Sequence, residues 1–348
     1  MTEPDHLDKE TSVSVSLTTA GVEAKARSRL LSAVDRLGGN IFEFANSFLE
    51  AGTSRRRATI EGERALIEAT AKWGIERISG DTEFAERAFA NHFKKIAAAQ
   101  INREEVLEAA IEDLCHSPPS SSAAIETETL SGPFLDRLDQ YAAEASTEEL
   151  RERWGRVLAA EVRKPGTFSN KVLRTIDELD AVTAALFEKV CTHRLGNVLP
   201  RCLAGQLSFD DQVRLTEAGL LVEPGLGQHR EFARTKTTGG DDIWIMVFSD
   251  DLVFTFPIET AIPPRSHFLG NGNEPIMQNG EGVGVPVYVL SEVGSAISSI
   301  LQDNTQAAFS AYCAAISRAL PSTTLSQFRR EGGNFVFVKT FDPPAQDS

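Results

Sequence analysis

Two places in the sequence bring cysteine and histidine together, the residue types best suited to metal binding and nucleophilic catalysis. Cys191, His193 and Cys202 share one short stretch, and Cys115 directly precedes His116. Structural zinc needs four ligands, normally in closely spaced pairs, and neither place supplies them. A catalytic cysteine needs an adjacent base, and no local signature of one is present. We therefore predict no metal site, no cofactor and no catalytic residue, and interpret the thiols as buried side chains.

Two glycine-rich stretches have part of the chemistry of nucleotide binding. Residues 239–242 read Gly-Gly-Asp-Asp, but no alternating strands and helices of a nucleotide-binding α/β domain surround them. Residues 280–285 read Gly-Glu-Gly-Val-Gly-Val, without the Lys-Ser/Thr ending of a P-loop, and they precede a strand. We interpret the first as a surface turn and the second as a flexible loop that could bind a partner.

Glu161 is a carboxylate on the apolar side of a predicted helix, one turn after Val157. A buried carboxylate needs a partner, and Lys171 or Arg174 on the following helix could provide one. No second carboxylate or histidine lies beside Glu161 in the sequence, so we interpret it as a structural tie and not as a general base.

The helix that carries Glu161 belongs to the clearest helical pattern of the chain, residues 146–191. Apolar residues recur there at the spacing of one helix face, with Trp154 and Leu158 as predicted core residues. Ser146 and Glu149 would form a capping box at its start. A proline–glycine pair then ends this helix, and two shorter helices follow.

Composition excludes several classes of protein. The 348 residues include 35 basic and 50 acidic side chains, a formal net charge of −15 that repels nucleic acids and anionic membranes. The four cysteines are scattered, as in a protein of the reducing cytoplasm. Neither a signal peptide nor an apolar run of about 18 residues is recognisable, so we predict a cytoplasmic protein without a transmembrane segment.

The pattern along the chain predicts a mainly α fold with a C-terminal α+β domain. Residues 1–23 are expected to form a disordered tail, and 24–203 a helical bundle that contains a Ser/Pro-rich linker at 116–129. Helices are expected at 59–78, from residue 81, and after a break at 102–114. Residues 204–344 are expected to form a small winged-helix-like domain with an antiparallel sheet.

Strands of the second domain are predicted at 243–248, 252–256, 285–290 and 334–341, and helices at 292–301 and 306–320. A helix near 207–220 followed by a hairpin is typical of a winged helix. Its recognition helix would present Asp210 and Asp211 to DNA, so we favour protein contact over DNA reading.

An apolar segment near the N-terminus is the predicted interaction surface. Phe42, Phe44 and Phe48 require a partner surface, either inside the protein or on another molecule. Contact with a membrane surface is disfavoured, because an interfacial helix carries Lys and Arg, and this one carries Glu43 and Glu50. A basic cluster follows directly. The predicted surface comprises Phe42, Phe44, Phe48, Arg55, Arg56 and Arg57.

The stretch Leu150–Phe187 resembles a known family. Its sequences Glu-Leu-Arg-Glu-Arg-Trp-Gly-Arg-Val-Leu-Ala-Ala-Glu-Val and Pro-Gly-Thr-Phe-Ser-Asn-Lys-Val-Leu-Arg-Thr-Ile-Asp-Glu-Leu-Asp are similar to the signature of an uncharacterised bacterial family catalogued as domain of unknown function 2806. The helix pair around Trp154 and Leu158 also resembles the Abi-alpha abortive-infection proteins. Those continue into elements that stand here as Leu215–Leu220 and Leu290–Gly294. The resemblance implies a fold and a defence role against phage, and no reaction.

Together these observations favour a bacterial protein-interaction or sensing module that acts by binding or self-association through its N-terminal helices. Two alternatives stay open. One is a winged-helix DNA-binding regulator, and the other is an enzyme whose site forms only in the fold.

Overall fold

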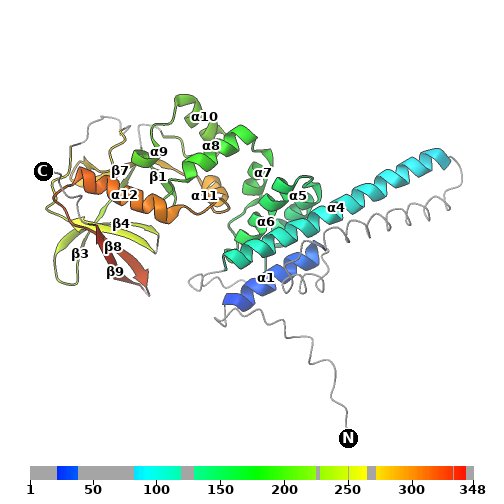
Figure 1. Cartoon of the computed structure of the whole chain (residues 1–348), viewed down its shortest axis with the longest axis horizontal. Coiled ribbons are helices and arrows are strands. Elements are labelled where there is room, and N and C mark those ends of the chain that lie inside the picture. The colour runs from blue at the N-terminus through cyan, green and yellow to red at the C-terminus, as the bar shows by residue number, and fades with distance from the viewer. Residues whose placement is uncertain are drawn as a thin grey trace, which may run out of the picture. The chain divides into compact units, whose positions relative to one another are not determined.

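The computed structural model describes residues 22–37, 82–118, 129–224, 228–249, 251–264, 272–331 and 333–341. The chain divides into two compact units, Met1–Leu173 and Arg174–Ser348. Helices make up the described part of the first unit, and antiparallel sheets lie in the second (Figure 1). This confirms the expected order of a helical part followed by an α+β part. The predicted interaction surface, Phe42 to Arg57, and the expected helix 59–78 lie outside the described residues.

The helical unit is built around one long helix. Its elements are α1 (Val22–Arg36), α4 (Thr82–His116), α5 (Gly132–Glu144), α6 (Glu148–Arg163) and the start of α7 (Asn170–Glu178). The helix α4 packs against both α5 and α6. Gly155 on α6 permits a close crossing, because a Cβ there would lie 2.5 Å from the Cβ of Ala109 on α4. Trp154 fills the neighbouring space and stacks on Tyr141, with ring centroids 4.6 Å apart.

Two local predictions in this unit were wrong. The expected break before residue 102 is absent, and α4 continues through it because residues 94–101 are mostly good helix formers, including three consecutive alanines. The cap of α6 is Thr147 and not Ser146, since the Thr147 hydroxyl accepts a hydrogen bond from the amide of Leu150.

The second unit begins about 30 residues earlier than the sequence suggested. Residues 174–203 were expected to belong to the helical part. However, β1 (Val198–Pro200) pairs with β7 (Gly282–Val289), and α8 (Ala181–Cys191) packs against α10 (Phe209–Glu217). The stretch after Leu173 therefore folds with the sheets.

Two antiparallel sheets form the body of the second unit. One has the strand order β3-β4-β5-β8-β9, and in the other β7 pairs with β1, β2 and β6. The remaining bounds are α9 (Arg201–Ala204), β2 (His229–Glu231), β3 (Ala233–Lys236), β4 (Asp242–Ser249), β5 (Leu252–Pro257), β6 (Met277–Asn279), α11 (Glu292–Ser298), α12 (Thr305–Ala319), β8 (Leu325–Glu331) and β9 (Asn334–Phe341).

The core of this unit lies between α12 and the sheets. Phe254 from β5 contacts Phe309 and Tyr312 from α12, with ring centroids 6.5 and 6.2 Å apart. Burying such aromatic rings supplies much of the stability of a domain. The winged-helix identity of the unit stays a prediction. Across the described helices, none is both long and apolar enough to cross a membrane.

Candidate functional site

The strand β9 is the most unusual surface of the sheet unit. It is an edge of the five-stranded sheet as described, pairing with β8 on one side. Each residue from Asn334 to Thr340 is exposed, although four of them in succession are large and apolar. Phe335 is 46% exposed and Phe337 is 55% exposed. Soluble proteins normally protect edge strands with charges, bulges or covering elements, so an apolar exposed edge indicates a binding surface.

Phe337 ends an apolar row that crosses the sheet. The strand registers place Val247 opposite Val253, Val253 opposite Phe328, and Phe328 opposite Phe337. Since side chains alternate along a strand, this row lies on the opposite face from Phe254 and the core. Val253 is fully buried within the row, whereas Phe337 at the edge is exposed. The phenyl rings of Phe328 and Phe337 meet edge to face, 5.7 Å apart.

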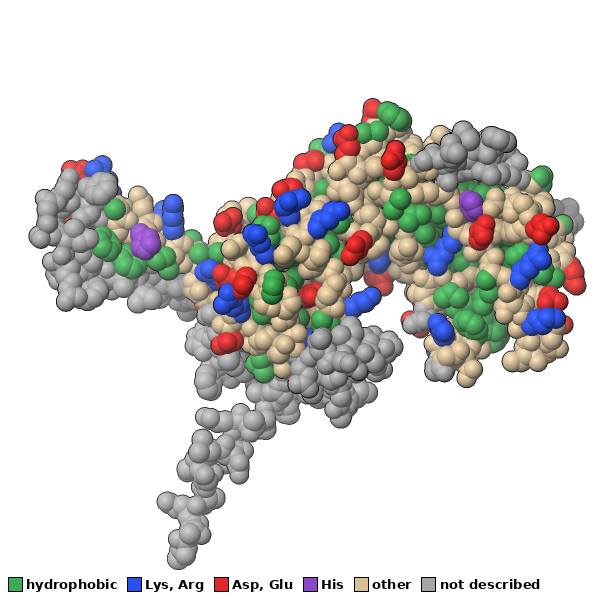
Figure 2. Space-filling model, turned by 180° about the vertical axis from the view of Figure 1, so that it is seen from behind, with side chains coloured by type: hydrophobic (Ala, Val, Ile, Leu, Met, Phe, Trp, Pro, Cys, Tyr) green, Lys and Arg blue, Asp and Glu red, His purple; other side chains and the backbone are tan. Residues whose placement is uncertain are grey.

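The β8–β9 hairpin that carries this row is basic, in contrast to the acidic chain. It contains Arg329, Arg330 and Lys339 but a single acidic residue, Glu331, a local charge of 3 − 1 = +2. One arginine is paired, because Arg329 Nη2 lies 2.6 Å from Glu331 Oε1. Hydrophobic side chains gather on the sheet unit between Lys and Arg side chains (Figure 2). The hairpin therefore has the chemistry to bind a partner strand that is apolar and has acidic residues beside it.

Glu161 lies in the helical unit and is 2% exposed. Its Oε1 accepts a hydrogen bond from the amide of Gly166 at 2.7 Å, and its Oε2 accepts one from the amide of Phe168 at 2.9 Å. Burial raises the pKa of Glu161, while these backbone hydrogen bonds and the charge of Arg29 oppose that rise. The carboxylate thus holds the turn between α6 and α7.

The partners of Glu161 differ from the cationic ones expected on the following helix. Arg174 pairs within its own helix, with its Nε 3.7 Å from Glu178 Oε1. Arg29, on α1, is the cation whose charge acts on Glu161, and its Nη1 donates to the carbonyl of Val162 at 2.9 Å. Burial lowers the pKa of the Arg29 guanidinium. Glu161 and Arg29 therefore connect α1 with the end of α6.

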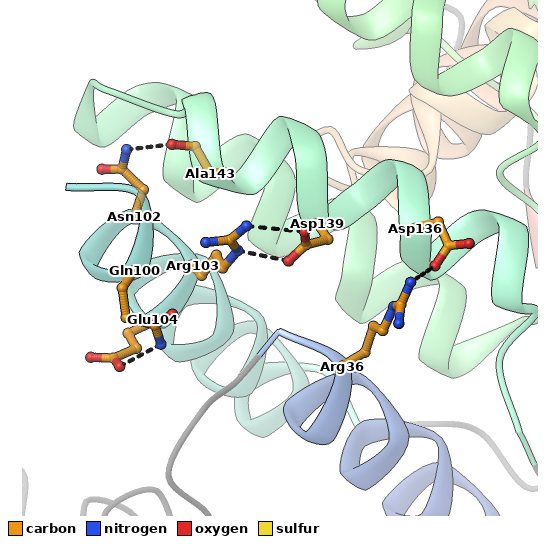
Figure 3. Close-up of polar contacts among 8 residues, drawn as sticks. All are labelled: Arg36, Gln100, Asn102, Arg103, Glu104, Asp136, Asp139 and Ala143. Atoms are coloured by element: carbon orange, nitrogen blue, oxygen red, sulfur yellow. Dashed lines mark hydrogen bonds and ion pairs between the residues drawn. The ribbon is translucent and has the colours of Figure 1, made fainter. Parts of the chain in front are cut away.

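Other ion pairs join the helices of this unit (Figure 3). Arg103 of α4 binds Asp139 of α5 through two hydrogen bonds of 2.6 and 3.0 Å. Arg36 of α1 pairs with Asp136 of the same helix α5. Two-point arginine–carboxylate contacts fix orientation as well as distance. These contacts are part of the helix packing.

Comparison with known proteins finds a family match that covers much of the helical unit and the beginning of the second unit. Residues 86–197 match the family model described as Protein of unknown function (DUF2806). This match confirms the resemblance inferred from Leu150–Phe187. Neither a search of curated proteins nor a search of solved structures gives a match.

The DUF2806 match runs from α4 to the residue before β1. It contains the predicted core residues Trp154 and Leu158, which are 2% and 0% exposed, together with Glu161. The apolar edge at β9 lies outside the match. The match thus covers helices α4 to α8, and the candidate binding surface lies outside it.

The cysteines next to histidines lie mostly in apolar surroundings. Burial raises the pKa of both Cys191 and Cys202 to about 12, so their thiols stay protonated and poorly nucleophilic near neutral pH. Burial also lowers the pKa of His193. Cys115 is exposed at the end of α4. Among the described side chains, no three His, Cys, Asp or Glu residues come together as a metal site.

The glycine-rich stretches are hairpin turns. Residues 237–241 close the β3–β4 hairpin, where the amide of Thr237 donates to the carbonyl of Asp241 at 2.9 Å, and Asp242 already begins β4. Residues 280 and 281 close the β6–β7 hairpin, and β7 begins at Gly282. The second stretch was expected to be a flexible loop as far as residue 285, and the structure corrects this, because three of those residues already pair with β6.

One polar cluster was missed by sequence reasoning. Asn279 Nδ2 lies 2.6 Å from His229 Nε2 and 3.0 Å from Glu231 Oε1. Its members come from β2 and β6, which are separated by about 50 residues but both pair with β7. No spacing signal in the sequence connects them. The cluster joins two strands by side-chain hydrogen bonds, and the Glu231 side chain is largely exposed.

Proposed function

We propose that this protein is a binding module, without catalysis, that receives a protein partner along the edge of β9. The observation that carries the proposal is the exposed apolar edge of β9, Phe335 to Val338, which continues the apolar row of the sheet at Phe337. Extended segments add to exposed sheet edges by main-chain hydrogen bonds, while side-chain positions on alternate faces give specificity. An edge that pairs with no further strand among the described residues, and that exposes phenylalanines, is suited to that mode of binding.

A DNA-binding function has less support. The helix α10, which would serve as the recognition helix, begins with Asp210 and Asp211, and both lie in its first turn. Carboxylates there would repel the phosphate backbone. Phe209 at the same end is 79% exposed, which suits an apolar contact better than base reading.

Phage defence of the abortive-infection type is the proposed setting. It is supported by the resemblance of Leu215–Leu220 and Leu290–Gly294 to elements of the Abi-alpha proteins. Expression from the native promoter should lower phage plating, and Phe337→Asp should restore it, while Phe209→Asp should not. Unchanged plating with the wild-type gene would remove defence from the proposal without affecting the binding function.

Photo-crosslinking tests the binding function itself. We would place p-benzoylphenylalanine at position 337 and, as a control, at the more exposed position 209 of the same unit. The proposal expects a discrete protein adduct from position 337, with its crosslinked peptide identified by mass spectrometry, and none from position 209. Absence of an adduct at 337, or the same adduct at both positions, would overturn it.

A further inference from the structure

We infer that the strand added to β9 is residues 12–17 of a second copy of this chain. This inference rests on the proposed binding function of β9 and names its partner. It is argued from the sequence pattern of the N-terminal segment, the side chains of the β9 edge, the charges of both, and the length of the connection to α1.

The N-terminal segment has the pattern of a strand with one apolar face. Residues 12–17 read Ser-Val-Ser-Val-Ser-Leu, a strict alternation of polar and apolar residues. Such alternation with β-branched residues is the sequence signal of a half-buried strand. Paired with β9, the segment would place Val13, Val15 and Leu17 on one face of the sheet. There they would extend the apolar row that now ends at Phe337.

The opposite face of the added strand would carry Ser12, Ser14 and Ser16. These small polar side chains would remain in contact with solvent, as expected for a strand at a new edge. An alternating segment would therefore cover the apolar edge of β9, and the new outer strand would carry apolar side chains on one face only. A second copy of β9 itself would bring Phe335, Val336, Phe337 and Val338 to both faces at once, so it fits less well.

Charge favours the same pairing. Residues 1–10 contain Glu3, Asp5, Asp8 and Glu10 against the single basic side chain Lys9, a side-chain charge of 1 − 4 = −3 with His6 neutral. The β8–β9 hairpin carries the opposite sign, +2. Complementary charge accelerates encounter and selects the partner more than it adds affinity.

The short connection to α1 favours a second copy over the same chain. Only residues 18–21 separate Leu17, the last residue of the proposed strand, from the start of α1 at Val22. Five residue steps of extended chain span about 17 Å, so pairing within one chain would require β9 to lie within that distance of the start of α1. A second copy has no such restriction. Reciprocal exchange of the two N-terminal segments gives a closed twofold dimer.

The test uses the full chain with p-benzoylphenylalanine at position 337, mixed with an excess of ¹⁵N-labelled wild-type chain. The inference expects a crosslink to a peptide from residues 1–21 that carries the ¹⁵N label. In sedimentation equilibrium the wild type should be a dimer. Val15→Pro and Phe337→Asp should each raise the dimer dissociation constant about 10-fold or more, whereas the controls Thr2→Pro and Phe209→Asp should leave it unchanged.

Several results would overturn the inference. An unlabelled N-terminal peptide in the crosslink would show pairing within one chain, and a labelled peptide from residues 334–341 would show β9 paired with β9. A crosslink to a different protein alone would remove the second copy and leave the proposed binding function intact. If position 337 crosslinks to no protein, both the inference and the proposed function fail.

Discussion

Gly294 packs on Leu220 so closely that a Cβ at position 294 would overlap the carbonyl oxygen of Leu220. The same carbonyl accepts a hydrogen bond from the amide of Ser291 at 3.0 Å, and Leu221 forms an antiparallel bridge with Leu290. Leu215–Leu220 and Leu290–Gly294, which lie about 70 residues apart in the sequence, therefore meet in one backbone contact. The contact fixes the start of α11 against the chain that leaves α10.

Gly294→Ala should destabilise the second unit by about 1–3 kcal/mol, because the added methyl group meets backbone atoms that cannot rotate away. Chemical denaturation followed by circular dichroism measures the change. Gly239→Ala is a matched control in the same unit, since a Cβ there would lie 3.6 Å from its nearest neighbours. Equal effects of the two substitutions would contradict the argument from close packing.

The protonation of Glu161 should make stability depend on pH in a defined direction. Burial raises the pKa of this carboxyl above its usual 4.5. Above pH 4.5 the folded protein binds a proton that the unfolded chain has already lost, so the contribution of Glu161 to stability is largest below pH 4.5 and falls as pH rises through the window above it. We expect Glu161→Gln to remove this decline, and to cost about 1–3 kcal/mol at neutral pH because an amide cannot accept both backbone hydrogen bonds.

Denaturation curves at a series of pH values would measure that slope. Glu149→Gln is the control, because its carboxylate is exposed, and hydrogen bonds from its own backbone amide and from Thr147 lower its pKa. The control should keep the decline above pH 4.5. A Glu161→Gln variant with the same slope as the wild type would show that the burial of this carboxyl is not its cause.

The helical part could be predicted from sequence because its signals are local. Apolar spacing identifies α6 and α8, although the cap of α6 was predicted one residue too early. The side chain of Asp180 caps α8 by accepting hydrogen bonds from the amides of Val182 and Thr183. The partners of Glu161 were harder to predict. Two of them are backbone amides of a turn, which have no signature in side-chain pattern, and Arg29 lies on a distant helix.

The candidate site was missed for a different reason. The run Phe-Val-Phe-Val in β9 has no alternation, and continuous apolar runs are typical of strands buried on both faces. Sequence reasoning thus predicted the strand correctly and gave no sign that its side chains are exposed. Exposure depends on strand order. In the sheet order β3-β4-β5-β8-β9, β8 lies between β5 and β9, so β9 is the last strand and forms an edge.

The four thiols should separate into two classes on alkylation of the folded protein. Cys115 is exposed, and partial burial and the charge of Glu112 raise its pKa, while burial raises the pKa of Cys191, Cys202 and Cys313 to about 12. At pH 8 we expect iodoacetamide to modify Cys115 first, and to modify the other three at rates lower by about 10-fold or more. Peptide mass spectrometry over time measures each site, and Cys115→Ser should remove the fast phase. Rapid modification of Cys191 or Cys202 would indicate an activated thiol and would favour the enzyme alternative.

Phe337 and Phe254 should show that binding and folding depend on opposite faces of the same sheet. Phe254 is fully buried against Phe309 and Tyr312, so Phe254→Ala should cost about 3–5 kcal/mol of unfolding free energy. Phe337 is 55% exposed in the single chain, so Phe337→Ala should change that free energy by about 0.5 kcal/mol or less when measured at concentrations below self-association. The same substitution should raise the dimer dissociation constant measured by sedimentation equilibrium. A large loss of monomer stability from Phe337→Ala would mean that the ring belongs to the core. That result would contradict the assignment of the β9 edge as a binding surface.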